Sequence, residues 1–173
     1  MQPNSPANKI FDSIYTFSEL QLFYKEIDTI VSSLFKSEGQ TEHTIHEMVS
    51  PEKAEHILEY LHTLSIDLKN PVAVQETLLK LKALGNQIPV VHMTLAFEPT
   101  NTVLKSISLW FLRREQKKVI LDLTLERQLL GGAFISYDGL YKDYTLKTKL
   151  DKYFSKEYDN KNNTTQIRYY ESF

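Results

Sequence analysis

The sequence predicts an α+β protein: a shortened N-terminal helical bundle, followed by a small α/β unit of order β-α-β-β-β-α. Apolar residues in the first half recur at spacings of three and four, which is typical of amphipathic helices. From Val91 onward they alternate with polar residues, which is typical of strands. Charge changes too: residues 1–84 have seven Lys against twelve Asp and Glu, a net of −5, whereas residues 85–173 have a net of +3. Together these changes predict two units.

The composition is that of an ordinary globular protein and excludes several classes of site. Of the 173 residues, 42% are apolar and 24% are charged. The absence of cysteine excludes disulfides, thiolate metal sites and a cysteine nucleophile. No run of apolar residues is long enough to cross a bilayer, and the polar residues 1–6 do not open a secretory signal.

The first half begins with two expected helices. A short one is expected around 9–16. Ser18, with Gln21 three residues later, fits a capping box that opens the next helix, over 18–36. Gly39 follows, where a helix can stop in a left-handed conformation.

Two further helix starts carry proline at the first helical position, Ser50-Pro51 and Asn70-Pro71. The second of these helices closes at Gly85. The segment 40–48 has an ambiguous pattern that fits one short turn.

In the second half, segments with the strand spacing of two residues alternate with segments that have the helical spacing of three and four. Strands at 91–97 and 119–125 flank a helix that starts near Pro99, with apolar residues up to Trp110 and Phe111. Asp138-Gly139 is a strong signal for a two-residue hairpin turn. The expected hairpin strands are 133–137 and 140–142, and the apolar residues of a last helix are Leu146, Leu150, Tyr153 and Phe154.

The change of period places the domain boundary. We expect a helical bundle over 1–86, an α/β domain over 87–154 and a polar tail over 155–173.

Motifs of catalysis and metal binding are missing from the chain. Gly131-Gly132 lacks the Gly-Lys-Ser/Thr of a phosphate loop and fits a tight turn. His43 and His46 lie near Glu47 without an HExxH pattern, so a solvated pair is the better interpretation. No catalytic residue, cofactor or metal is therefore assigned, and a small enzyme is only the third hypothesis.

Nucleic-acid binding is an alternative with partial support. The order of elements resembles an RNA-recognition sheet, but Gly131–Ile135 has one aromatic residue and no leading basic residue. The basic residues Arg113 and Arg114 end a helix, where the dipole favours cations. An RNA-associated or other α/β adaptor module is kept as the alternative function.

A set of spaced residues in the second half carries a more specific signal. The set is Leu129-Leu130-Gly131-Gly132, then Asp138-Gly139, then Asp143-x-Thr145. It resembles the C-terminal region of the ATP synthase delta subunit, called the oligomycin-sensitivity-conferring protein in mitochondria, over about 88–154. The glycines permit a turn between strands, and Asp143 can cap the last helix by accepting an N–H from Thr145 or Leu146.

The resemblance implies a non-catalytic peripheral-stalk, or stator, subunit of a rotary ATP synthase. In that family the helical domain binds the N-terminal helix of subunit alpha, and the C-terminal region binds the C-terminal end of subunit b. The catalytic head is thereby kept from rotating with the rotor. The implied setting is bacterial: cytoplasmic, at the peripheral face of the inner or plasma membrane, with no membrane insertion, no nucleic acid and no cofactor. Candidate partner-binding residues are Leu22, Phe23, Tyr24, Ile27, Tyr153 and Phe154.

Overall fold

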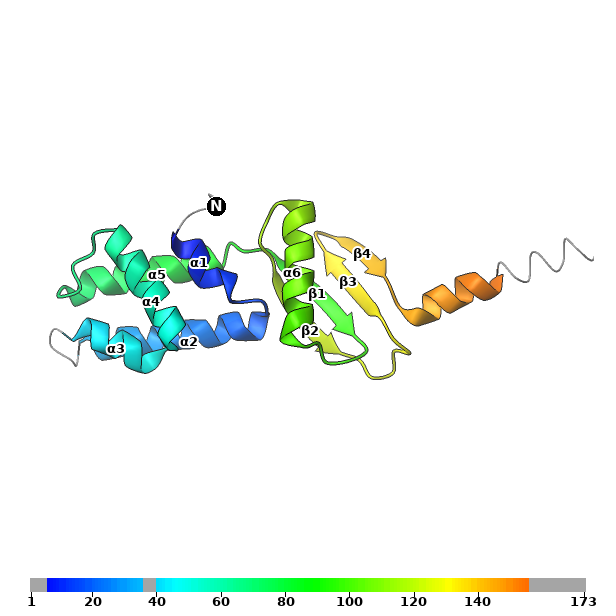
Figure 1. Ribbon diagram of the computed structural model, residues 1–173, viewed down its shortest axis with the longest axis horizontal. Coiled ribbons are helices and arrows are strands. Elements are labelled where there is room, and N and C mark those ends of the chain that lie inside the picture. Colours follow the sequence, from blue (N-terminus) through cyan, green and yellow to red (C-terminus); the bar gives the residue numbers. More distant parts are fainter. Residues whose placement is uncertain (1–5, 36–39, 156–173) are drawn as a thin grey trace, which may run out of the picture. The chain divides into compact units, whose positions relative to one another are not determined.

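The computed structural model describes residues 6–35 and 40–155 and has the predicted α+β order, helices first and a small sheet afterwards (Figure 1). Contacts within the chain divide it into two compact units. The helical unit consists of Met1–Val90 and Asn101–Asp122, and the hairpin unit consists of Val91–Thr100 and Leu123–Phe173. A domain boundary near residue 86 stays a proposal from the change of period.

The helical unit is built on a bundle of five short helices (Figure 1). Helix α1 packs on α4, α2 packs on α5 and α3, and α3 packs on α4. Their apolar stripes meet in one core, in which Phe11 and Phe23 make an edge-to-face contact with ring centroids 6.1 Å apart. The helices of the unit are α1 (Pro6–Asp12), α2 (Phe17–Leu34), α3 (Thr41–Met48), α4 (Pro51–Thr63), α5 (Pro71–Gly85) and α6 (Asn101–Glu115).

The N-cap of helix α2 lies two residues before Ser18, the predicted cap. Its cap is Thr16, whose hydroxyl accepts the N–H of Glu19 at 3.2 Å, while the Glu19 carboxylate accepts the N–H of Thr16 at 2.9 Å. The predicted Ser18–Gln21 capping box was wrong. A carboxylate is a stronger acceptor than an amide, and Glu19 also accepts the N–H of Tyr15 at 2.8 Å.

The two proline starts are confirmed. Asn70 accepts the N–H groups of Val72 and Ala73, both at 3.2 Å, and Ser50 precedes Pro51 without a side-chain bond. Residues 40–48, which were predicted as one short turn, contain the eight-residue helix α3.

Tertiary contacts explain two features that the pattern leaves open. The buried Thr41, at the start of α3, donates its hydroxyl to the Leu68 carbonyl at 2.7 Å. At the end of α5, a Cβ on Gly85 would lie 2.5 Å from the Tyr24 hydroxyl and 2.9 Å from Phe11. Gly85 is therefore required by close packing. The predicted stop at Gly39 and residues 156–173 of the tail predicted over 155–173 lie outside the described residues.

The segment between the first two helices also pairs with the start of β2 (Ile120–Leu125) within the helical unit. Leu121 donates its N–H to the Tyr15 carbonyl at 2.8 Å, and Thr16 and Leu121 form an isolated parallel bridge. The Lys118 ammonium lies 4.9 Å from the Tyr15 ring centroid and donates to the Asp12 carbonyl at 3.3 Å. Burial lowers the pKa of Lys118, while Asp12 and Glu19 act in the opposite direction.

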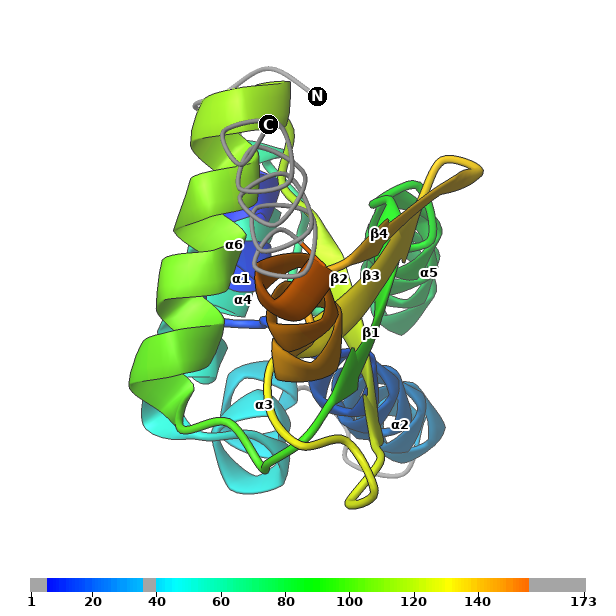
Figure 2. The same cartoon turned by 90° about the vertical axis from the view of Figure 1, so that its right-hand side faces the viewer.

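The strands form one sheet of order β2-β1-β3-β4. Strand β1 (Val90–Leu95) pairs antiparallel with β3 (Ala133–Tyr137), with His92 opposite Ser136. Strand β3 pairs antiparallel with β4 (Leu140–Asp143), and Figure 2 shows β1, β3 and β4 running side by side. Val91, Met93 and Leu95 are buried and His92 is exposed, which confirms the predicted alternation.

The hairpin turn has the predicted geometry. Asp138 and Gly139 both have positive φ, +49° and +72°, as a type I′ turn requires. After β4 the chain forms a last helix over 146–155.

Candidate functional site

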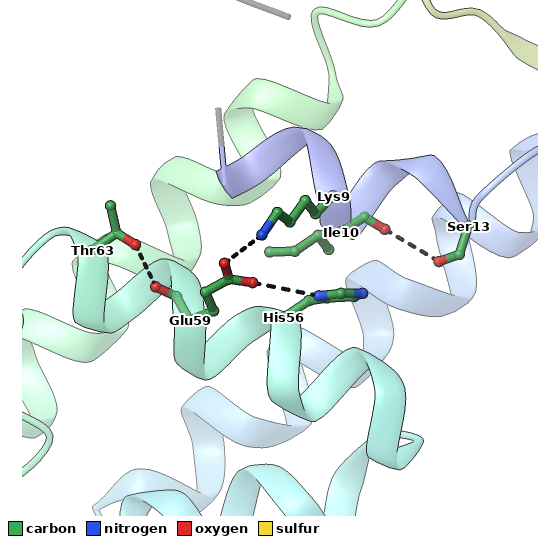
Figure 3. A network of polar contacts seen from close by, with 6 residues as sticks. All are labelled: Lys9, Ile10, Ser13, His56, Glu59 and Thr63. Atoms are coloured by element: carbon green, nitrogen blue, oxygen red, sulfur yellow. Dashed lines mark hydrogen bonds and ion pairs between the residues drawn. The ribbon is translucent and has the colours of Figure 1, made fainter. Parts of the chain in front are cut away.

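Charged side chains gather where α1 meets α4 (Figure 3). The Lys9 ammonium lies 2.5 Å from one Glu59 oxygen, and the His56 ring lies 3.8 Å from the other. The hydrogen bond from Lys9 lowers the pKa of Glu59. Lys9 and Glu59 are both exposed, so this network joins two helices and contributes little to the free energy of unfolding.

The histidines considered as metal ligands lie on the exposed side of α3. His43 pairs with Glu47 at 3.6 Å, and His46 is exposed. Over residues 6–35 and 40–155, no three His, Cys, Asp or Glu side chains come close enough to hold a metal ion.

The spaced motif of the second half comes together at the start of the last helix. The Gly131 carbonyl accepts the N–H of Leu146 at 2.8 Å. Gly132 has a φ of +90°, and a Cβ there would lie 2.3 Å from the Tyr144 carbonyl oxygen. No other residue fits without a shift of the backbone, so the glycine pair lets this turn pass directly under the chain that opens the helix.

Asp143 and Thr145 complete the start of that helix. Asp143 accepts the Thr145 N–H at 2.8 Å and the Thr148 hydroxyl at 2.5 Å. The Thr145 hydroxyl, which is buried, accepts the N–H of Thr148 at 3.4 Å. These bonds and the one from Leu146 satisfy N–H groups that a helix start leaves without partners. The two donors, Thr148 first, lower the pKa of Asp143.

The leucines of the motif border a surface hollow of about 320 Å³. Leu129 and Leu130 line it together with Phe134, Asp143 and Thr148. Leu129 is half-buried and Leu130 is 71% exposed, so the turn displays an apolar side chain beside the helix start.

The last helix carries an exposed apolar stripe. Leu146, Leu150, Tyr153 and Phe154 follow the spacing i, i+4, i+7 and i+8, which places them on one side of a helix. They are 44%, 38%, 65% and 53% exposed. Side chains of this size in such a row are typical of a surface that binds another protein.

The candidate residues on α2 divide into buried and exposed ones. Phe23 and Ile27 are fully buried, and Tyr24 is 8% exposed, so these three pack in the core of the helical unit. Leu22 is 54% exposed and faces away from that core. Helical spacing separates the two sets, and this signal was already present in the sequence.

Two parts of the site lie outside the candidate residues that the sequence indicates. Leu146 and Leu150 share the helical spacing of Tyr153 and Phe154, so this spacing could have identified them as candidates. The contact of Gly131 with Leu146 has no local signal, because the two residues are fifteen positions apart and only the folded turn brings them together.

Among the described helices, none has both the length and the apolar character that a bilayer crossing requires. No curated protein sequence matches the chain significantly. The family described as "ATP synthase delta (OSCP) subunit" matches residues 10–156, which is most of the chain and includes the motif turn and the last helix. The chain therefore belongs to the ATP synthase delta (OSCP) family, whose members are structural subunits of the peripheral stalk.

Proposed function

We propose that this protein is a non-catalytic stator subunit that links the N-terminal helix of subunit alpha to the C-terminal end of subunit b. It would hold the catalytic head against the torque of the rotor during ATP synthesis. In this proposal it is a peripheral protein on the cytoplasmic side of a bacterial membrane. The helical bundle over 1–86 binds alpha, and the α/β domain over 87–154 binds b.

The observation that carries the proposal is the exposed stripe of the last helix. Subunit b is expected to present a helix, and two helices associate by aligning apolar residues at spacings of three and four. Tyr153 and Phe154 provide large contact areas, which are typical of residues that dominate binding energy. The Gly-Gly turn and the Asp143 cap support this role because they fix where the helix starts.

For subunit alpha, the helical unit offers Leu22 on α2 and Leu79 on the neighbouring α5. Their side chains are 54% and 45% exposed. Exposed leucines on two adjacent helices are compatible with binding an amphipathic helix of the head. The core residues Phe23 and Ile27 hold α2 in place beneath this surface.

The test uses the full chain with two separate probes, a peptide of the alpha N-terminal helix and the soluble part of subunit b from the same genome. The double variant Tyr153→Ser/Phe154→Ser should weaken binding of b by at least about tenfold and leave alpha binding unchanged. Leu22→Glu should do the reverse, so each variant is the control for the other. A wild-type chain that binds neither probe would rule the proposal out.

A further inference from the structure

Strand β4 is the outer strand of the sheet and has an open edge. It pairs with β3 on one side, and no described segment pairs with its other side (Figure 1). The Tyr144 N–H donates to the Ala133 carbonyl at 2.9 Å, and bonded pairs alternate with unbonded ones along an antiparallel ladder. The backbone of Lys142 therefore faces β3, whereas the N–H and C=O groups of Tyr141 and Asp143 point to the open edge.

The side chains at this edge are open as well. Leu140 and Tyr141 are 65% and 67% exposed. The Tyr141 ring stacks on Phe134 of β3, with ring centroids 5.6 Å apart, so one face of the hairpin carries an aromatic pair. Open edges pair readily with other strands, and native proteins usually cover or charge them. The edge of β4 therefore offers backbone bonds and apolar contacts to one further strand.

A segment of the chain beyond the described residues has the composition of a strand. Over 164–170, five of seven residues are Thr, Ile or Tyr, which are enriched in strands, and Gly and Pro are absent from 156–173. The described last helix, over 146–155, spans about 15 Å, and the twelve residues 156–167 can extend over about 40 Å. The chain is therefore long enough to return from the end of this helix to β4.

We propose that residues 166–171 add to the open edge of β4 as a further, antiparallel strand of the same chain. In the register that sets Arg168 opposite Asp143, Tyr170 lies opposite Tyr141 and extends its aromatic pair. Opposite charges and aromatic rings on facing residues are pairs that stabilise a sheet. The inference concerns the fold of this chain and does not depend on the proposed stator function.

The charges of β4 argue against a second copy of β4 as the occupant. Two such strands, paired antiparallel with Tyr141 opposite Asp143 in each direction, would place Lys142 opposite its own equivalent, and like charges directly opposite each other are destabilising. The register that sets Tyr141 opposite itself avoids this contact but pairs only residues 140–142 of β4. A strand with a cation opposite Asp143 fits the edge better.

The test measures amide hydrogen exchange by NMR in the full-length protein. If the added strand forms, the N–H groups of Tyr141 and Asp143 should exchange at least about tenfold more slowly than in a variant that breaks it. Lys142 is the internal reference, because its N–H faces β3 and should stay protected in every variant.

Two proline variants form a matched pair, since each replaces one tyrosine of the added strand. In the proposed register the Tyr170 N–H points to β4 and the Tyr169 N–H points away from it. Proline is tolerated in an edge strand only where the lost N–H faces solvent. Tyr170→Pro should therefore abolish the protection of the Tyr141 and Asp143 amides, and Tyr169→Pro should keep most of it.

Three outcomes would overturn the inference. The first is exchange of the Tyr141 and Asp143 amides in the wild type as fast as in Tyr170→Pro, and the second is an equal loss of protection in both proline variants. The third is protection that falls on about tenfold dilution, which would assign the added strand to a second molecule. Binding of subunit b to the same samples tests the stator function separately, because Tyr153 and Phe154 are unchanged in both variants.

Discussion

In the helical unit many large apolar side chains are fully buried, and Phe11, Phe23 and Leu78 are at most 1% exposed. In the hairpin unit Leu140 and Tyr141 on β4 are 65% and 67% exposed. All four β4 residues are exposed, whereas the buried positions of α2 and α4 recur at every turn of the helix. The helical unit thus has a large buried core, whereas in the hairpin unit Val91, Met93 and Leu95 of β1 are buried and the apolar side chains of β4 and the last helix are exposed.

This difference separates two uses of the same residue types. Complete burial of a leucine or phenylalanine side chain stabilises the folded state by roughly 1.5–3 kcal/mol. The helical unit gains this stabilisation from contacts within itself. For the exposed side chains of β4 and the last helix, the same gain requires a partner. A subunit that joins other subunits requires both, a body that folds alone and a surface completed by assembly.

The largest expected difference between the two units is in the loss of stability when one leucine of each is replaced by alanine. Leu78→Ala removes a fully buried side chain and should lower the free energy of unfolding by about 2–5 kcal/mol. Leu150→Ala changes a side chain that is 38% exposed and should cost no more than about 0.5–1 kcal/mol. Urea denaturation of the isolated protein measures both. Equal losses would mean that the last helix is packed in the free protein.

A second pair of variants separates close packing from backbone conformation within the hairpin unit. Gly132→Ala places a Cβ 2.3 Å from a backbone oxygen at positive φ and should cost about 3 kcal/mol. Gly139→Ala also has positive φ but meets nothing within 4 Å, so only the conformational cost of about 1 kcal/mol remains. Thermal denaturation followed by tyrosine near-UV circular dichroism compares them. Similar costs would contradict the tight contact at Gly132.

The corresponding contact in the helical unit is between Gly85 and Tyr24. Gly85→Ala should cost about 1–3 kcal/mol, because the new methyl group overlaps the Tyr24 hydroxyl. That hydroxyl is buried and has no hydrogen-bond partner among the described residues, so Tyr24→Phe alone should be neutral or slightly stabilising. Combined, the two substitutions should cost less than their sum. Additive costs in a double-mutant cycle would show that Phe11 causes the clash instead.

The smallest expected effect concerns one carboxylate in each unit. The hydroxyl of Thr148 and the N–H of Thr145 lower the pKa of Asp143. The Lys9 ammonium lowers the pKa of Glu59. Because the pKa is lower in the folded state, each carboxylate stabilises the fold fully at pH values above its ordinary, unfolded-state pKa. This stabilisation is lost as the pH falls through the folded pKa, so acid below about pH 4 should weaken both.

Salt should distinguish the two carboxylates. Added salt screens the ion pair of Glu59 and should bring its pKa back towards the ordinary value, while Asp143, with neutral donors, should change little. Carbon NMR titration of the two carboxyl groups measures this. Asp143→Asn and Glu59→Gln assign the signals, and an equal response to salt would contradict the stated causes.

Much of the fold followed from patterns that are local in sequence. Proline at the first helical position placed α4 and α5, and Asp138-Gly139 placed the hairpin. The α2 start was misplaced because two overlapping capping signals lie two residues apart, and the carboxylate of Glu19 prevailed over the amide of Gln21. The local pattern of residues 40–48 is ambiguous, and the buried Thr41 at the start of α3 bonds to Leu68, a contact far along the chain that no local pattern indicates.

For the site, the residue types were visible and their exposure was not. Helical spacing identifies Leu22 and Phe23 as lying on different sides of α2, but it does not say which side meets a core. The same holds for Trp110, which the pattern of α6 grouped with Phe111 and the structure exposes. Exposure depends on what other elements cover.

The sequence by itself determined the class of fold, the order of elements and the membership of the family, because hydrophobic period, turn residues and motif spacing are properties of the chain. The tertiary structure decided which apolar residues are buried and which remain exposed. It also decided why Gly85 and Gly132 must be glycine, since a clash with Tyr24 or with the Tyr144 carbonyl exists only when distant segments meet. Long-range packing, which has no local signature, makes those decisions.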